Sequence, residues 1–253
     1  MPRPSILITG AARRLGAAVA EAFGAAGWHV VIHYGRSASE AEGLAERLPS
    51  AEAIHCDLAD SLAASRMVEQ LALRLNDWRV LVNCAAIFRP DDVTGLDPAV
   101  FDRSMAINAK TPVRMAQAFL RHARSRRGRT VIQFTDQKLE NTNPDFFSYT
   151  LSKHAAAGAL PMLAMGAAWP EDRIYGLAPG AILASHDQSE AETAISHRLN
   201  LLRRRTEPGE IADACLFLAR GCLASGETLF IDSGQHLLRQ PRDVIYLARE
   251  AAG

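Results

Sequence analysis

The sequence predicts a single α/β domain, built as a doubly wound parallel sheet of about seven strands flanked by helices. Short runs of β-branched and other apolar residues alternate with longer amphipathic stretches along the 253 residues. The short runs are continuously apolar, which is typical of strands that are buried on both faces of a sheet. No repeat and no linker rich in Pro, Gly or Ser divides the chain. One domain of Rossmann type is therefore expected over residues 1–253.

Each predicted element follows from this alternation. The predicted strands are Ser5–Thr9, His29–His33, Ala53–His55, Val80–Asn83, Thr130–Phe134, Arg173–Leu177 and Thr228–Ile231. The predicted helices are Leu15–Ala26, Ser39–Leu48, Leu62–Leu75, Pro98–Ala123, Tyr149–Ala168 and Pro208–Leu218. The polar character of residues 136–148 predicts a long loop. Residues 180–203 follow the sixth strand and are long enough to form a substrate lid. The tail, residues 240–253, is interpreted as a C-terminal extension without an assigned role.

Composition argues against several classes of function. A net charge of zero and a pI near 7.1 do not favour nucleic acid or an anionic membrane as a partner. The basic run Arg121–Arg129 is interpreted as the solvated end of a helix, closed by Gly128. The four cysteines show no CxxC spacing, which argues against a zinc site or a disulfide framework. Without a membrane-length apolar run or room for a signal peptide, a cytoplasmic protein with a small-molecule substrate is expected.

A dinucleotide site is predicted where the first strand meets the first helix. Glycines in Thr9–Gly16 (TGAARRLG) allow close approach of a pyrophosphate, which the helix N-terminus stabilises. Only two of the usual three glycines are present, so an ordinary strand–helix turn explains the motif equally well by itself. The second strand ends in HYGRS, with no acid before Glu40 to hold a ribose diol. Arg36 and Ser37 suit a 2′-phosphate, which favours NADPH/NADP; a solvated loop charge is the alternative for Arg36.

The predicted cofactor contacts lie in the turns that follow successive strands. They are Gly10, Arg13, Arg14, Leu15, Gly16, Tyr34, Arg36, Ser37, Asp57, Leu58, Asn83, Ala85, Pro179 and Gly180. Asp57 and Leu58 are expected at the adenine. Asn83 and Ala85 are expected to flank the cofactor, with a plain strand-to-helix turn as the alternative.

Together these motifs resemble those of the short-chain dehydrogenase/reductase family across nearly the whole chain. The matching segments are TGAARRLG, CDLAD, NCAA, INA around Asn108, YTLSK at 149–153 and APG at 178–180. The resemblance implies an active centre that contains Tyr149, Lys153 and Asn108, in which Asn108 holds a water that refills the proton site. It also implies a homotetramer whose main interface is formed by helices Pro98–Ala123 and Tyr149–Ala168.

The chain departs from the general family pattern in a systematic way. Asp136 stands where the family usually has serine, Arg14 replaces the middle glycine, and Cys84–Ala86 loosens the usual NNAG motif. These departures are similar to the pteridine reductase branch, which includes the bacterial dihydromonapterin reductases. Phe88 and the lid segment Ile182–Ala191 extend the similarity. The substrate contacts expected on this basis are Phe88, Arg14, Asp136, Tyr149 and Leu183.

The chemistry of Asp136 favours a nitrogen-containing substrate. Tyr149 is the candidate acid, and the Lys153 ammonium one helical turn away would lower its pKa from about 10. A carboxylate at Asp136 cannot donate to a ketone oxygen and opposes negative charge on it. It suits N–H groups or a basic ring nitrogen, and it favours the protonated phenol, so that Asp136 and Tyr149 relay a proton to a C=N bond. A simple loop cap is the alternative reading of Asp136.

The predicted function is NADPH-dependent reduction of a dihydropterin such as dihydromonapterin, dihydrobiopterin or dihydrofolate. Phe88 would stack on the pterin ring, and Arg14 would reach the pterin carbonyl or the cofactor phosphates. A loop-anchoring hydrophobic contact is the alternative for Phe88. Reduction of a small ketone or acyl substrate remains open, as does a non-catalytic NADP(H)-binding sensor. The intact trio of Asn108, Tyr149 and Lys153 argues against the sensor.

Overall fold

The computed structural model describes residues 3–185 and 187–252. Seven parallel strands form one sheet in the order β3–β2–β1–β4–β5–β6–β7. The strands are β1 (Ser5–Ile8), β2 (His29–Tyr34), β3 (Ala51–His55), β4 (Trp78–Asn83), β5 (Thr130–Phe134), β6 (Arg173–Pro179) and β7 (Thr228–Ile231). The fold class is confirmed, and the bounds of β5 and β7 agree with the prediction. The chain reverses direction across the sheet between β1 and β4, the point at which such sheets bind ligands.

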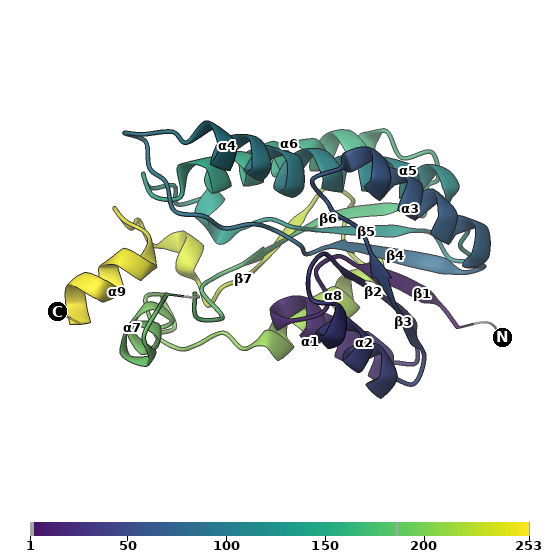
Figure 1. Ribbon diagram of the computed structural model, residues 1–253, viewed down its shortest axis with the longest axis horizontal. Helices are drawn as coiled ribbons and strands as arrows, with labels where there is room; N and C mark the ends of the chain where they lie inside the picture. Colours follow the sequence, from purple (N-terminus) through teal and green to yellow (C-terminus); the bar gives the residue numbers. More distant parts are fainter. Residues whose placement is uncertain (1–2, 186, 253) are drawn as a thin grey trace.

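Helices cover both faces of the sheet (Figure 1). One layer contains α1 (Arg14–Ala25), α2 (Ala38–Arg47) and α8 (Pro208–Leu218); the other contains α3 (Ser61–Arg74), α4 (Pro98–Ser104), α5 (Thr111–His122) and α6 (Phe147–Met165). Successive strand residues point to opposite layers: Ile6 and Ile8 pack in one core and Leu7 in the other. Burial on both faces explains why the strands read as continuous apolar runs.

The predicted continuous helix Pro98–Ala123 is wrong in its middle. A π-helical turn, η1 (Met105–Lys110), separates α4 from α5. Pro112 has no N–H, so it cannot give the carbonyl of Asn108, four residues earlier, the regular α-helical hydrogen bond. Single π turns inside α-helices are frequent at functional sites, and Asn108 lies in this one.

The basic run Arg121–Arg129 is not wholly a solvated helix end. Helix α5 stops at His122, and the last arginine of the run, Arg129, is only 7% exposed. Its guanidinium pairs with Asp172, with Nη2 and Oδ2 2.5 Å apart. Gly128 does not cap the helix; it adopts φ +87° in the turn before β5, where a Cβ would lie 2.5 Å from the carbonyl oxygen of Glu171. Tertiary pairing therefore decides the role of Arg129.

Two helices lie beyond the carboxyl ends of the strands, at the left of Figure 1. They are α7 (Glu190–Ser196), within the predicted lid, and α9 (Val244–Ala252), in the C-terminal extension, and they pack on each other. Arg249 of α9 joins them through Glu192 of α7, with Nε and Oε1 3.3 Å apart, and it also pairs with Asp187 just before α7 at 2.7 Å. Short 3₁₀ turns occur at η2 (Gln137–Leu139) and η3 (Gln235–Leu237). None of the helices in the described part of the chain has the length and apolar character needed to cross a bilayer.

Candidate active site

A cavity of about 860 Å³ opens at the carboxyl ends of the strands. Its volume lies in the upper part of the range of small-molecule sites. The predicted site residues on its wall are Gly10, Arg13, Arg14, Leu15, Gly16, Tyr34, Arg36, Ser37, Ala85, Phe88, Asp136, Tyr149, Lys153, Pro179, Gly180 and Leu183. The fold therefore brings most of the predicted residues to one place.

Four predicted residues lie outside the cavity wall: Asp57, Leu58, Asn83 and Asn108. The Asp57 carboxylate accepts from the backbone N–H of Ala59 at 2.9 Å. Leu58 is buried, and the Asn83 amide donates to the carbonyl of Pro112 at 3.2 Å. These contacts support the turns around the cavity, and direct cofactor contacts by these residues stay predictions.

The turn after β1 is held close to its neighbours. Gly10 has φ +66°, and a Cβ there would lie 3.0 Å from Cα of Ala85, so glycine suits both the dihedral and the close approach. The Gly10 N–H donates to Nδ1 of buried His33 at 3.2 Å, while Nε2 of His33 lies 3.0 Å from the carbonyl oxygen of Cys56. Burial lowers the pKa of His33 to about 4. A neutral ring that donates from Nε2 therefore fixes this turn.

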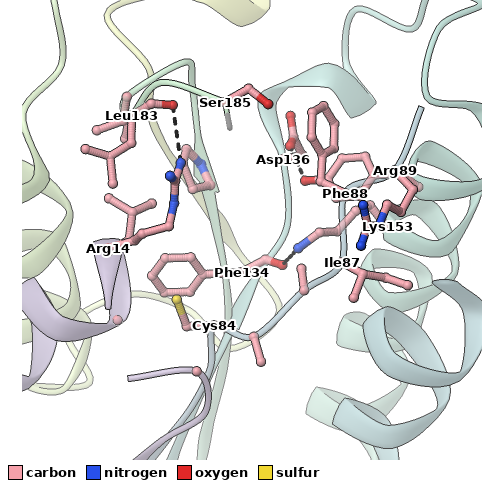
Figure 2. Close-up of a pocket in the computed structure, with 18 of the residues that line it drawn as sticks. Arg14, Cys84, Ile87, Phe88, Arg89, Phe134, Asp136, Lys153, Leu183 and Ser185 are labelled. Atoms are coloured by element: carbon pink, nitrogen blue, oxygen red, sulfur yellow. Dashed lines mark hydrogen bonds between the residues drawn. The ribbon is translucent and has the colours of Figure 1, made fainter. Parts of the chain in front are cut away.

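Arg14 connects the start of α1 with the predicted lid. Its backbone has φ +58°, in the left-handed region that usually favours glycine, at the position where the general family has one. Figure 2 shows its guanidinium directed at the backbone of Leu183. Nη2 donates to the carbonyl of Leu183 at 3.4 Å and to that of Ala184 at 3.0 Å. Arg14 thus stands at the cavity wall, between the turn after β1 and the segment after β6.

Arg36 supplies an exposed positive charge at the end of β2. Among residues 3–185 and 187–252, no carboxylate lies within ion-pair distance of its guanidinium. Neighbouring Arg13, by contrast, pairs with Glu40 at 3.6 Å. An unpaired guanidinium beside Ser37 leaves its fork of N–H donors available to an anion in the cavity.

The centre of the site is a hydrogen bond between Tyr149 and Asp136. Tyr149 lies in the first turn of α6, and its Oη donates to Oδ2 of Asp136 at 2.5 Å. Asp136 immediately follows β5 and Thr135, and its Oδ1 accepts from the backbone N–H of Lys138 at 2.8 Å. Lys153, one turn further along α6, donates from Nζ to the carbonyl of Phe134 at 2.6 Å (Figure 2). The Asp136 carboxylate therefore caps the η2 turn and also accepts from the Tyr149 phenol.

Burial is the largest cause of the pKa shifts of Asp136, Tyr149 and Lys153. It raises the pKa of Asp136 and lowers that of Lys153. Burial and the adjacent Asp136 carboxylate together raise the pKa of Tyr149 well above its ordinary value. The structure thus favours the protonated phenol expected from Asp136 over the lowered phenol pKa expected from Lys153. The raised pKa favours a phenol that keeps its proton and donates it in the hydrogen bond to the carboxylate.

Asn108 braces the site from the π turn. Its Oδ1 accepts from the backbone N–H of Ile87 at 2.8 Å, and its Nδ2 donates to the carbonyl of Ile87 at 2.9 Å. Nδ2 also lies 3.0 Å from Oγ of Ser152, between Tyr149 and Lys153 on α6. The side chain therefore ties the segment after β4 to α6. The water-holding role of Asn108 stays a prediction.

An aromatic cluster surrounds Phe88, which lines the cavity with Tyr149. Its ring stacks on Phe146, with centroids 3.9 Å apart, and meets the Tyr149 ring edge-on at 4.7 Å. Phe146 in turn stacks on Tyr246 of α9, with centroids 5.9 Å apart. Phe88 is half-buried, with one ring face covered by Phe146. Its position beside Tyr149 places an aromatic surface next to the candidate acid.

Sequence reasoning missed several residues at this site. Phe146 packs in the same cluster as Tyr149, and the cavity is also lined by Lys138, Asp243 and the α9 residues Val244 and Ile245. The apolar positions Val244, Ile245 and Ala248 are spaced as on one face of a helix, which was the available signal. That pattern predicts a buried face but does not say what covers it. Only the fold brings α9 to the site.

This fold, its phosphate-suited turn and the Asp136–Tyr149–Lys153 arrangement define a nucleotide-dependent oxidoreductase. The chain belongs to the short-chain dehydrogenase/reductase family. A model of one of its branches, described as enoyl-(acyl carrier protein) reductase, matches residues 10–236. The resemblance seen in the motifs is therefore confirmed.

Known relatives include reductases of two substrate types. The granaticin polyketide synthase putative ketoacyl reductase 2 of Streptomyces violaceoruber is 28% identical, over 93% of this chain and 97% of its own. Pteridine reductase 1 of Leishmania tarentolae is 26% identical with the same coverage. The crystal structure of FolM alternative dihydrofolate reductase 1 from Brucella canis, complexed with NADP, superposes with a TM-score of 0.87. It is 33% identical and covers 95% of this chain and 96% of its own.

Proposed function

We propose that this protein is an NADPH-dependent reductase that transfers a hydride to a dihydropterin. The observation that carries the proposal is the 2.5 Å hydrogen bond from Tyr149 to Asp136 at the wall of the cavity. A carboxylate at this point suits a ring nitrogen or N–H group and opposes negative charge on a ketone oxygen. The similarity to pteridine reductase 1 and to an alternative dihydrofolate reductase supports the same class of substrate.

The residues present fit NADPH. The N-terminus of α1, beside the close turn at Gly10, suits a pyrophosphate, and Arg13 and Arg14 line the same part of the cavity. Arg36 and Ser37 offer donors for a 2′-phosphate at the end of β2. Bound NADPH supplies the hydride. The NADP complex of the Brucella canis protein supports this choice of cofactor.

The chain itself handles the proton. Reduction of a C=N bond adds a hydride to carbon and a proton to nitrogen, so one proton must come from the protein or solvent. Tyr149 holds its proton because burial and Asp136 raise its pKa, and its hydroxyl lies in the wall of the cavity. Asp136 and Tyr149 share one hydrogen bond, so the two groups give up a proton and are refilled as a unit. Lys153 holds the end of β5 against α6 through the carbonyl of Phe134.

A dihydropterin carries a 2-amino group and amide-like N–H groups. The Asp136 carboxylate at the cavity wall can accept from such groups, which supports a pterin over a ketone.

Oxidation of NADPH by the purified protein, with matched panels of dihydropterins and small ketones, tests the proposal. Turnover confined to dihydropterins is expected. Turnover confined to ketones would contradict the assigned substrate and would favour the carbonyl reductase suggested by the ketoacyl reductase relative. NADPH binding without turnover of either panel would favour a sensor. Light scattering in the same buffer measures whether the chain forms the homotetramer that we also propose.

Arg36→Ala is expected to weaken NADPH binding about 10- to 100-fold, because a charge-assisted contact contributes about 1.5–3 kcal/mol. NADH affinity should change little, since NADH lacks the 2′-phosphate. Fluorescence titration with both cofactors measures the ratio. Arg47→Ala, at an exposed arginine of α2, is the matched control and should leave both affinities unchanged. An unaltered NADPH-to-NADH ratio in Arg36→Ala would remove the 2′-phosphate assignment.

Phe88→Ala should raise the KM for the dihydropterin about 2- to 10-fold, because aromatic stacking contributes about 0.5–1.5 kcal/mol beyond burial. NADPH affinity should stay near the parent value. Steady-state kinetics measure the change, and thermal unfolding reports the cost of losing the contact with Phe146. Phe217→Ala, on the partly exposed face of α8, serves as the control. An unchanged KM would mean that Phe88 only anchors its loop.

A further inference from the structure

A buried ion pair joins the C-terminal extension to the catalytic turn. Nζ of Lys138 lies 2.9 Å from Oδ2 of Asp243, and the two side chains are 3% and 12% exposed. Lys138 belongs to the turn η2 directly after Asp136, and Asp243 immediately precedes α9. Both residues line the cavity. A segment about a hundred residues away in sequence therefore reaches the centre of the site.

Lys138 contacts both carboxylates at once. Its backbone N–H donates to Oδ1 of Asp136 at 2.8 Å, while its ammonium donates to Asp243. The ammonium also lies 5.3 Å from the centroid of the Phe146 ring, which helps to hold it in place. Movement of Asp243 would therefore move the turn that positions Asp136.

Asp243 is itself held firmly. Its backbone N–H donates to Oδ2 of Asp145 at 2.8 Å, and its Oδ1 accepts from the N–H of Ile245 at 3.1 Å. Asp145 is paired in turn with Arg242 at 2.9 Å. Asp145 thus holds the backbone of Asp243, and the first turn of α9 holds its Oδ1. Its remaining contact is the one to Lys138.

The pair also affects the charge balance at the reacting groups. Burial raises the pKa of Asp136, and the Lys138 ammonium is among the groups that oppose this rise. Burial and Asp136 raise the pKa of Tyr149, and the Asp243 carboxylate adds to that rise. Lys138 and Asp243 therefore act in opposite directions on the same pair. The charged or titratable groups around them are Asp136, Tyr149 and Lys153 on the cavity side and Asp145, Arg242 and Tyr246 on the α9 side.

We propose that Lys138 and Asp243 are positioning residues that hold Asp136 and balance the charge around the Asp136–Tyr149 pair, so that the extension 240–252 forms part of this chain's own catalytic centre. This inference rests on the proposed proton-relay function of Asp136 and Tyr149. Isolated buried ion pairs contribute little net stability, because desolvation offsets the attraction between the charges. A role in setting protonation accounts for a pair placed here.

Two single variants with opposite effects on charge test this proposal. Asp243→Asn leaves the Lys138 ammonium uncompensated, which stabilises the deprotonated form of the Asp136–Tyr149 pair. The pH above which kcat falls should then move down, by about half a unit or more. Lys138→Met leaves the Asp243 carboxylate uncompensated and should raise the pH above which kcat falls. The double variant Lys138→Met/Asp243→Asn restores the balance of charge and should return this pH towards the parent value.

The pH profile of kcat is measured with whichever substrate the parent protein reduces, so a wrong substrate class would not be mistaken for failure of this inference. NADPH affinity and thermal unfolding are measured alongside. Glu69→Gln, at an exposed residue of α3 away from the cavity, is the control and should leave the profile unchanged. The proposal would be overturned if the two single variants moved the pH at which kcat falls in the same direction. It would also be overturned if they lowered kcat without moving that pH. If Asp243→Asn does not fold, the comparison of Lys138→Met with the double variant still shows in which direction the Asp243 charge moves the fall of kcat at high pH.

Discussion

Tyr149→Phe is expected to lower kcat about 10²- to 10⁴-fold, the range that a positioned general acid contributes. The phenylalanine ring keeps the edge-on contact with Phe88 but removes the hydroxyl that donates to Asp136 at 2.5 Å. The proton for the substrate nitrogen must then come from a less well placed donor. Single-turnover oxidation of NADPH in the presence of a dihydropterin measures the chemical step directly.

Tyr175→Phe is the matched control for this change. Tyr175 is also buried, and its hydroxyl donates to the carbonyl of Leu223 at 2.8 Å, away from the cavity wall. This variant should lose about 1 kcal/mol of stability and keep its kcat. NADPH affinity should be unchanged in both variants. A Tyr149→Phe enzyme with a kcat near that of the parent would show that another group is the acid.

Asp136→Asn should lower kcat by a similar factor, about 10²- to 10⁴-fold, while NADPH affinity changes little. The amide still offers an oxygen to the N–H of Lys138, so the cap of η2 is kept. It cannot share a proton with Tyr149. Stopped-flow kinetics and cofactor titration separate the two effects. Equal losses in turnover and cofactor affinity would mean a structural role for Asp136, and Asp102→Asn, at an exposed position of α4, controls for loss of charge.

The pH dependence of Asp136→Asn gives a second readout of the same change. Burial raises the pKa of Asp136, so the carboxyl group holds its proton to higher pH than an ordinary aspartate. In the parent, kcat should fall as the pH rises through the pKa of the Asp136–Tyr149 pair, because the form that carries the proton is lost. In Asp136→Asn, the contribution of the carboxyl group to this fall of kcat at high pH should be absent. A profile identical in shape to that of the parent would contradict the relay.

Asp136→Ser tests the substrate class from the opposite direction. A serine hydroxyl can donate to a ketone oxygen, and the general family has serine at this position. The variant should lose activity with dihydropterins and gain relative activity with small ketones. The ratio of kcat/KM for the two substrates measures the change. If this ratio stays constant, Asp136 does not determine substrate class.

Local sequence patterns predicted most of the fold. The bounds of β5, β7 and α8 agree with the expected ones because apolar runs, Pro208 at a helix start and turn residues are local signals. The break at Asn108 was not predicted, although Pro112 carries the physical reason for it. The predicted solvated position of Arg129 was wrong. Its partner Asp172 lies in a separate turn, which only the folded sheet brings next to Arg129. Errors of this kind arise wherever a distant partner outweighs local propensity.

The candidate site divides in the same way. The cofactor turn, Asp136, Tyr149 and Lys153 were predicted because their chemistry lies in short motifs at the ends of strands, which converge on one edge of a parallel sheet. The stacking of Phe146 on Phe88 and Tyr246 and the ion pair between Lys138 and Asp243 were not predicted. Phe146 and Asp243 carry no motif, and their roles depend on contacts with residues far away in sequence.

The sequence by itself determined the fold class, the edge of the sheet that carries the site and the residues that point to hydride and proton transfer. The periodicity of side chains and the local turn chemistry are sufficient for those conclusions. Only the tertiary structure decided the direction of the Tyr149 pKa, because burial and the 2.5 Å approach of Asp136 both raise it. It also decided the place of the C-terminal extension. The apolar face of α9 could have covered any exposed surface, and the ion pair with Lys138 holds it at this chain's own cavity.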